Sequence, residues 1–213
     1  MLQQIFEYPF LMRIFNKILD DKTKIILTTL CSSIKNQRHK LIFNKRYKVT
    51  KKDKKKWYYN CLTNIIVKRC FKFPENATIV RFYDSFNKPI NDLIKFNHNI
   101  IDLNFGFSFN KSIQKCIPNS IINLNLGIQF NRPLKNSIPE SVRYLTFSYD
   151  FNRKIKEDDP LKLPNSITHL IFKSGYSKKF IKLPSSLKFL CASLNFFEVN
   201  EDIIPKNITI VYT

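Results

Sequence analysis

Residues that commonly carry catalysis are few in this chain and lie far apart in the sequence. Its three histidines are His39 in a basic run, His98 near a repeat corner and His169 in an alternating apolar segment. None of them has a Ser, Cys or Asp partner at a spacing typical of nucleophilic or acid–base catalysis. The three glycines form no phosphate-binding loop. We therefore expect a protein that is not an enzyme and needs no cofactor.

The cysteines predict reduced thiols, with neither a metal cage nor a disulfide framework. They are odd in number, scattered and never in a Cys-x-x-Cys pair: Cys31, Cys61, Cys70, Cys116 and Cys191. Charges at Glu7 and Arg13 interrupt the apolar residues that a signal peptide would need, and no run approaches the ~20 apolar residues of a membrane span. We expect a cytoplasmic or nuclear protein without membrane contact.

The formal net charge of +20 is concentrated in the first third of the chain. Residues 1–72 hold 18 Lys and Arg against 4 Asp and Glu, whereas residues 73–213 hold 18 against 12. The lysine run 48–56 is typical of a solvated linker or a charged helix face. The aromatic residues 57–59 that follow fit the lead into a first buried strand at 64–67, or a stacking platform for single-stranded nucleic acid. A basic nucleic-acid-binding solenoid is therefore an alternative function, with nucleic acid the less favoured partner.

A frame of about 21 residues repeats through the second part of the chain. Its units begin at Pro74, Asn97, Pro118, Pro139, Pro164, Pro184 and Pro205, so the offsets are 23, 21, 21, 25, 20 and 21 residues. Counting the first residue of a unit as position 0, the frame is apolar at −1, Ser or Asn at +2, aliphatic at +3, +6 and +8, aromatic at +12, Asn at +13 and aliphatic at +16. A fixed period of this length predicts a stack of similar coils.

Each unit contains an apolar–polar–apolar triplet, such as Leu124-Asn-Leu126, which predicts a short strand with one buried face. If the units stack, these strands form one parallel sheet, and the residues at +12 form an aromatic column in the core: Phe86, Phe109, Phe130, Phe151, Tyr176 and Phe196. Proline at position 0 suits the corner before the strand. Ser or Asn at +2 can bond backbone in that corner, and Asn at +13 fits a turn or an amide ladder that bonds the next coil.

The outward positions of the predicted sheet are the candidate binding surface. One pair per unit is free to vary while the core frame is constant. The candidate residues are Arg81, Asp102, Asn104, Asn123, Asn125, Tyr144, Thr146, His169, Ile171 and Phe189. The first half of this set is polar, and the second half is apolar and aromatic. An apolar patch near Tyr144, Ile171 and Phe189 predicts an anchor for a protein partner.

The repeated pattern, with FNKPI at Phe86 and FNRPL at Phe130, resembles the FNIP repeat, a relative of the leucine-rich repeats. The resemblance covers about two-thirds of the chain and implies a curved solenoid with a parallel sheet. In proteins of social amoebae and large DNA viruses such repeats often follow an F-box, which for a viral protein implies the host cytoplasm.

Two short amphipathic segments precede the repeats. Apolar residues at helical spacing predict one helix over 10–19 and a second up to residue 34, with Asp20 and Asp21 at the turn between them. The run 14–34 resembles the F-box, which implies docking on a Skp1-type linker of a cullin ubiquitin ligase through Leu11, Ile14, Phe15, Leu19, Leu27 and Leu30. A plain helical cap that seals the first repeat is the alternative.

The sequence thus predicts an α+β protein in three parts: a helical F-box-like segment or cap at 1–43, a basic linker at 44–63 and a leucine-rich-repeat-like solenoid with a parallel β-sheet at 64–213. The expected function is a protein–protein interaction adaptor, an F-box-type substrate receptor whose sheet binds the substrate. A repeat scaffold without a ligase link is a further alternative.

Overall fold

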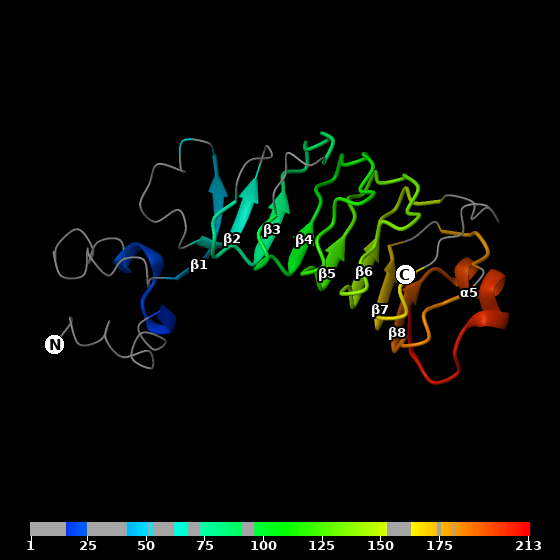
Figure 1. The fold of residues 1–213 in the computed structure, drawn as a ribbon. Coiled ribbons are helices and arrows are strands. Elements are labelled where there is room, and N and C mark those ends of the chain that lie inside the picture. The colour runs from blue at the N-terminus through cyan, green and yellow to red at the C-terminus, as the bar shows by residue number, and fades with distance from the viewer. Residues whose placement is uncertain are drawn as a thin grey trace.

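The computed structural model describes residues 16–24, 42–50, 52, 62–67, 73–90, 96–152, 163–173, 176–180 and 182–213. Within them, nine strands form one parallel sheet whose order follows the chain, as Figure 1 shows along the long axis of the molecule. The strands are β1 (Phe43–Val49), β2 (Leu62–Val67), β3 (Ile79–Phe82), β4 (Asp102–Asn104), β5 (Asn123–Asn125), β6 (Tyr144–Phe147), β7 (His169–Phe172), β8 (Phe189–Ala192) and β9 (Thr209–Tyr212). This confirms the predicted parallel solenoid.

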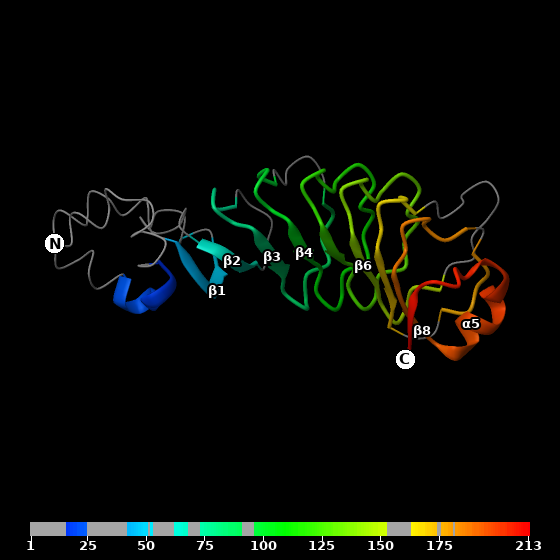
Figure 2. The ribbon, with the colours of Figure 1, turned by 90° about the horizontal axis from the view of Figure 1, so that it is seen from below.

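The register of the sheet places equivalent repeat positions side by side. The leucines at +6 pair from β4 to β8 and are buried: Leu103, Leu124, Leu145, Leu170 and Leu190. Because a one-residue slip would turn these leucines to the outer face, burial of this column fixes the register. The view turned by 90° shows the strands following one another as successive coils (Figure 2).

The aromatic side chains at +12 form the predicted column through the core. Ring centroids lie 5.8 Å apart between Phe86 and Phe109, 6.1 Å between Phe109 and Phe130, and 6.4 Å between Phe130 and Phe151. Tyr176 continues the stack 5.8 Å from Phe151. All five side chains are buried, so each coil contributes a large apolar ring to its neighbours.

Side-chain amides and hydroxyls bond consecutive coils together. The Asn110 amide N–H donates to Asn87 Oδ1 at 3.0 Å, and the Asn131 N–H donates to Asn110 Oδ1 at 3.1 Å. These bonds confirm the amide ladder. Ser at +2 also reaches the previous coil, because Ser141 Oγ donates to the Ile121 carbonyl at 2.7 Å. We expected the residue at +2 to bond backbone within its own corner. For Ser141 this expectation is wrong, because the acceptor lies in the previous coil.

Asn97 replaces proline at the corner of one coil by a similar route. Its Nδ2 donates to the carbonyl of Pro74, the corner residue of the preceding coil. A side-chain bond between coils thus holds this corner in place without the fixed φ of proline.

The N-terminal end of the sheet departs from the predicted layout. Residues 44–49 were expected in a basic linker, but β1 includes them and pairs in parallel with β2. Phe43 and Val49 are buried, so this strand extends the core by one coil despite its charged side chains. The first strand is therefore β1, which precedes the strand expected at 64–67.

A buried ion pair joins the described residues 16–24 to β1. Lys24 Nζ donates to the carbonyl of Ile42 at 2.8 Å and to Asp21 Oδ1 at 3.3 Å, and Tyr47 Oη donates to Asp21 Oδ2 at 3.2 Å. Lys24 is 1% exposed, so its charge depends on these partners. The Thr23 N–H donates to Asp20 Oδ1 at 2.8 Å, so Asp20 provides the capping bond at this acidic turn.

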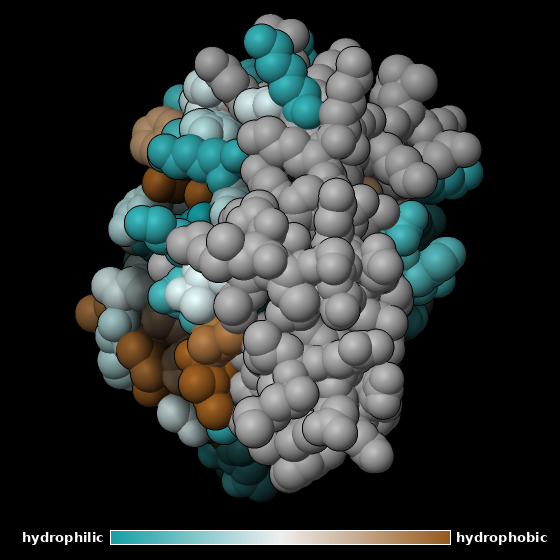
Figure 3. Space-filling view, turned by 90° about the vertical axis from the view of Figure 1, so that its left-hand side faces the viewer, coloured by the Kyte–Doolittle hydropathy of each residue, from teal (hydrophilic) through white to brown (hydrophobic). Residues whose placement is uncertain are grey.

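The helical cap predicted for 1–43 is not supported. Only 16–18 and 21–24 are helical in the described part of that segment. Leu19, predicted to be helical, lies in a bend, and the other predicted helical residues lie outside the described ranges. Figure 3, which faces this end, shows hydrophilic side chains around smaller hydrophobic areas on the described surface. Across the described ranges, every helix is too short or too polar to cross a bilayer.

The coil that begins at Pro184 contains the helix α5 (Leu194–Asn200), followed by the 3-10 helix η4 (Glu201–Ile203). Asn200 in α5 is fully buried and accepts a hydrogen bond from the Phe180 amide at its Oδ1. In β9, Ile210 pairs with Leu190, so the unit that begins at Pro205 is one residue shorter before its strand than the frame predicts.

Candidate interaction surface

The outer face of the sheet carries two columns of side chains, one at +5 and one at +7. The register aligns Asp102, Asn123, Tyr144, His169 and Phe189 in the first column. Because the aliphatic residue at +6 points inward from β3 to β8, its neighbours at +5 and +7 point outward. The ten predicted surface residues therefore lie on one continuous face.

Three rings at +5 stack on this face, and we call Tyr144, His169 and Phe189 the aromatic row. The ring centroids of Tyr144 and His169 lie 4.4 Å apart, and those of His169 and Phe189 lie 5.6 Å apart. Tyr144 is 46% exposed, while His169 and Phe189 are half-buried. His169 Nδ1 shares a hydrogen bond with Thr168 Oγ1 at 2.9 Å, which fixes the ring orientation. The row is thus an ordered apolar surface within reach of a partner.

The residues beside the aromatic row at +7 are small or aliphatic. Thr146, Ile171 and Cys191 lie on β6, β7 and β8 and are half-buried. Burial raises the pKa of the Cys191 thiol, which keeps it in the neutral form. The half of the face from β6 to β8 therefore has the apolar character that the sequence predicted.

The other half of the face is made of short polar side chains on β4 and β5: Asp102, Asn104, Asn123 and Asn125. All four are half-buried by their neighbours in the columns. Asn123 Oδ1 is shielded from solvent and has no hydrogen-bond partner among the described residues. Asn123 pairs with Tyr144 in the register, so this orphaned oxygen lies where the polar half meets the aromatic row.

Positive side chains occupy the N-terminal end of the same face. Arg81 Nη1 donates to Asn64 Oδ1 at 2.7 Å, so the predicted surface residue on β3 is held by its neighbour on β2. Arg46 and Lys48 on β1 pair with Asn64 and Ile66 and extend the face by one coil. These two surface residues were not predicted from the sequence. The many charges in this segment obscure the strand-like alternation in which Tyr47 and Val49 point inward.

Of the residues predicted to dock on a Skp1-type protein, only Leu19 lies within the described ranges. Leu11, Ile14, Phe15, Leu27 and Leu30 lie outside the described residues. Leu19 is half-buried and packs against the hydrophobic core.

The described ranges hold no group of three or more His, Cys, Asp or Glu residues that could bind a metal ion. Cys116 Sγ donates to the Ile90 carbonyl at 2.7 Å, and Cys191 is a free thiol. His98 lies beside the Asn97 corner and His169 is part of the aromatic row, whereas His39 lies outside the described residues. What the described surface offers is therefore a stacked apolar contact area.

One strand per coil, nine parallel strands in chain order and a continuous core define a parallel β-solenoid. Part of this solenoid consists of FNIP repeats, since the FNIP Repeat family model matches residues 109–150 and 130–174.

Among solved structures, the chain is similar to the crystal structure of CroV588, described as a novel circular LRR protein. The identity is 24% and the TM-score 0.46, over 72% of this chain and 30% of that one. This chain therefore spans less than a third of the length of that protein. Comparison with curated proteins gives no match.

Proposed function

We propose that this protein is an interaction scaffold that binds a partner protein on the outer face of its sheet, with the aromatic row as the anchor. The observation that carries the proposal is the ordered stack of Tyr144, His169 and Phe189 on a face whose other described positions carry no aromatic ring. Aromatic side chains at the centre of an interface supply much of the binding energy, while polar residues around them exclude water. Aspartate and asparagine on β4 and β5 provide such a polar rim.

A solenoid supports this function because its face is extended and rigid. Each strand pairs with the next, and the core behind it is continuous from Phe43 to Phe197. A partner that covers several coils therefore meets side chains whose spacing is preset, and little ordering entropy opposes binding.

The test compares two exposed tyrosines of the same chain. Tyr144→Ala removes the accessible ring of the aromatic row, whereas Tyr149→Ala removes a ring that is 52% exposed but follows the strand β6 and lies off the sheet face. Full-length wild-type and variant proteins would capture partners from the native cell with cross-linking, and titration calorimetry would then measure the affinity of the cross-linked partner. We expect Tyr144→Ala to weaken binding by about thirtyfold or more, the effect of a 2 kcal/mol anchor, and Tyr149→Ala to leave it unchanged. Equal affinities of wild type and Tyr144→Ala would contradict the proposal.

The narrower hypothesis of a cullin-ligase adaptor rests on the resemblance of residues 14–34 to the F-box. It predicts co-purification with Skp1 that is lost in an Ile14→Ala, Phe15→Ala variant whose repeats remain folded. Unchanged capture of Skp1 by that variant, or no capture by the wild type, would leave a scaffold without a ligase link.

A further inference from the structure

A second surface lies on the layer opposite the sheet. After each strand the chain passes the aromatic residue at +12 and runs back across the core; we call positions +13 to +17 the return segment. Four described return segments carry a cation at +14: Lys88, Lys111, Arg132 and Lys178. The intervening coil has Arg153 at the same position, outside the described residues.

This recurrence exceeds what composition explains. Lysine and arginine are 36 of 213 residues, so about one in six positions would be basic by chance, whereas +14 is basic in five consecutive coils. The neighbouring position +15 holds Pro89, Ser112 and Pro133 in the first three of them. The cations thus form a row at one position.

Hydrogen bonds hold this row in register. The ladder from Asn87 through Asn110 to Asn131 fixes the backbone directly before each of the first three cations. Arg132 Nε also donates to the Asn110 carbonyl at 3.0 Å, so the arginine stem lies across the previous coil.

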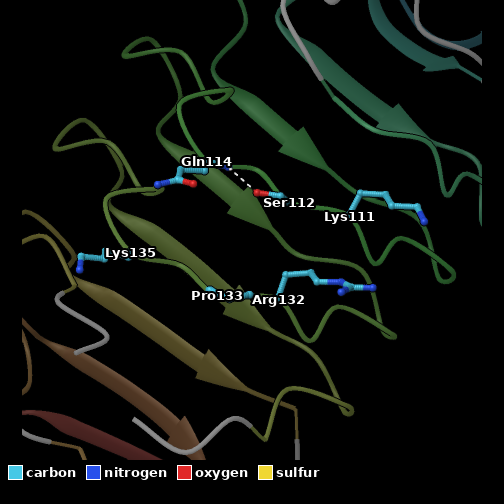
Figure 4. A pocket seen from close by; sticks show the side chains of 6 residues that line it. All are labelled: Lys111, Ser112, Gln114, Arg132, Pro133 and Lys135. Carbon is cyan, nitrogen blue, oxygen red and sulfur yellow. Dashed lines mark hydrogen bonds between the residues drawn. The ribbon is translucent and has the colours of Figure 1, made fainter. Parts of the chain in front are cut away.

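Among the described residues, no negative charge pairs with the row over its first three coils. In the described part of the chain, Lys88, Lys111 and Arg132 make no ion pair, and residues 87–90, 110–115 and 131–136 contain no Asp or Glu. Between two coils lies an open hollow of about 470 Å³ (Figure 4), lined by Lys111, Ser112, Gln114, Arg132, Pro133 and Lys135. The row ends in the last coil, where Glu198 takes the +14 position and Lys179 Nζ pairs with Asp202 at 3.0 Å.

The spacing of the row indicates which polyanion it fits. Strands in a sheet lie about 4.8 Å apart. The ring centroids at +12, farther from the sheet, repeat at 5.8, 6.1 and 6.4 Å. Each cation follows its ring by two residues, so we infer a similar repeat of roughly 6 Å for the row, which is close to the ~6.7 Å between alternate residues of an extended peptide.

Single-stranded nucleic acid fits this layer less well than an acidic peptide. Sequence-tolerant binding of single strands uses aromatic platforms beside the cations. The described residues 87–90, 110–115 and 131–136 contain no aromatic residue.

We propose that the +14 row binds an extended acidic segment of a partner protein, with carboxylates at alternate positions paired to Lys88, Lys111 and Arg132. This surface is separate from the aromatic row, so one protein can hold two partners or two segments of one partner.

The experiment uses the full chain and a fluorescent peptide of alternating Glu and Ser, read by anisotropy at low and at physiological salt. The test variant carries Lys88→Glu, Lys111→Glu and Arg132→Glu. The control carries the same change of net charge at three exposed lysines outside the row, Lys182→Glu, Lys188→Glu and Lys206→Glu. We expect the test variant to bind about tenfold more weakly or worse, and the control to stay within about twofold of wild type.

Two further measurements test whether binding depends on the spacing of the carboxylates and on the +14 row alone. A peptide of the same composition with its Glu residues clustered should bind more weakly than the alternating one, and Tyr144→Ala should bind the alternating peptide like wild type. If charge reversal unfolds the chain in a thermal melt, the Lys111→Gln and Arg132→Gln double variant gives the same comparison. Failure of the wild type to bind, equal losses in test and control variants, or tighter binding of oligothymidine by the same three cations would each overturn the proposal.

Discussion

The hydroxyl of Tyr176 gives the sharpest test of the stacked core. Tyr176 occupies the +12 position, is 1% exposed, and its Oη has no hydrogen-bond partner among the described residues. Its ring lies 5.8 Å from that of Phe151 and 5.0 Å from that of Phe172. Phenylalanine fills the same position in neighbouring coils, so Tyr176→Phe keeps the packing and removes only the orphaned hydroxyl.

The expected gain is the desolvation cost of that group. Burying a hydroxyl without a partner costs about 1–3 kcal/mol, so Tyr176→Phe should raise the free energy of unfolding by that amount at neutral pH. Urea titration followed by circular dichroism would show a higher midpoint with an unchanged slope. The reciprocal variant Phe151→Tyr places a hydroxyl in the adjacent buried ring and should lower the midpoint by a comparable amount.

The pH dependence provides an independent check. Burial raises the pKa of Tyr176 well above its ordinary value of 10.0. The unfolded hydroxyl therefore ionises above pH 10 while the folded one stays protonated, so the wild type loses stability as pH rises above that value. Relative to Tyr176→Phe, the loss is about 1.4 kcal/mol per pH unit until the folded group also ionises. A variant that is no more stable at neutral pH, with a gap that does not widen above pH 10, would refute the reasoning.

Three further predictions concern the repeat geometry. Gly127→Ala should destabilise the fold by about 1–3 kcal/mol, since its Cβ would lie 2.0 Å from the carbonyl oxygen of Gly106 in the previous coil; an unchanged urea midpoint would show that the coils can separate. Lys115→Asn should stabilise by about 1 kcal/mol or less, because φ is 57° at Lys115 and the equivalent residue of the next coil is Asn136 with φ 50°; a lower melting temperature would contradict this. Phe130→Ala should cost about 3–5 kcal/mol through a cavity between two rings, and a loss below 1 kcal/mol in the urea midpoint would show that the column collapses around it.

The period and the core were readable from the sequence because each buried position recurs in every coil. A column such as Leu103, Leu124 and Leu145 repeats at a fixed offset, and the strand period of two places its neighbours outside. The outer residues at Tyr144, His169 and Phe189 followed from the same frame. The amide ladder of Asn87, Asn110 and Asn131 was readable for the same reason, since it too recurs at a fixed position.

Strand β1 could not be predicted from the sequence, because charged residues separate its core positions and no later coil repeats its residue pattern. Pairing with β2 buries Phe43 and Val49, and that gain appears only when the neighbouring strand is in place.

The sequence by itself determined the repeat, the parallel sheet and the outward residues. These features depend on the spacing of residues within one unit, and every stacked unit repeats that spacing. Tertiary structure decided how those outward residues meet: the distance of 4.4 Å that makes Tyr144 and His169 one surface, and the spacing near 6 Å that sets the pitch of the cations at +14. The second distance reflects a widening of the coils away from the sheet, because rings at +12 lie 5.8 to 6.4 Å apart whereas neighbouring strands lie about 4.8 Å apart. That widening is a property of the assembled stack, and no single repeat encodes it.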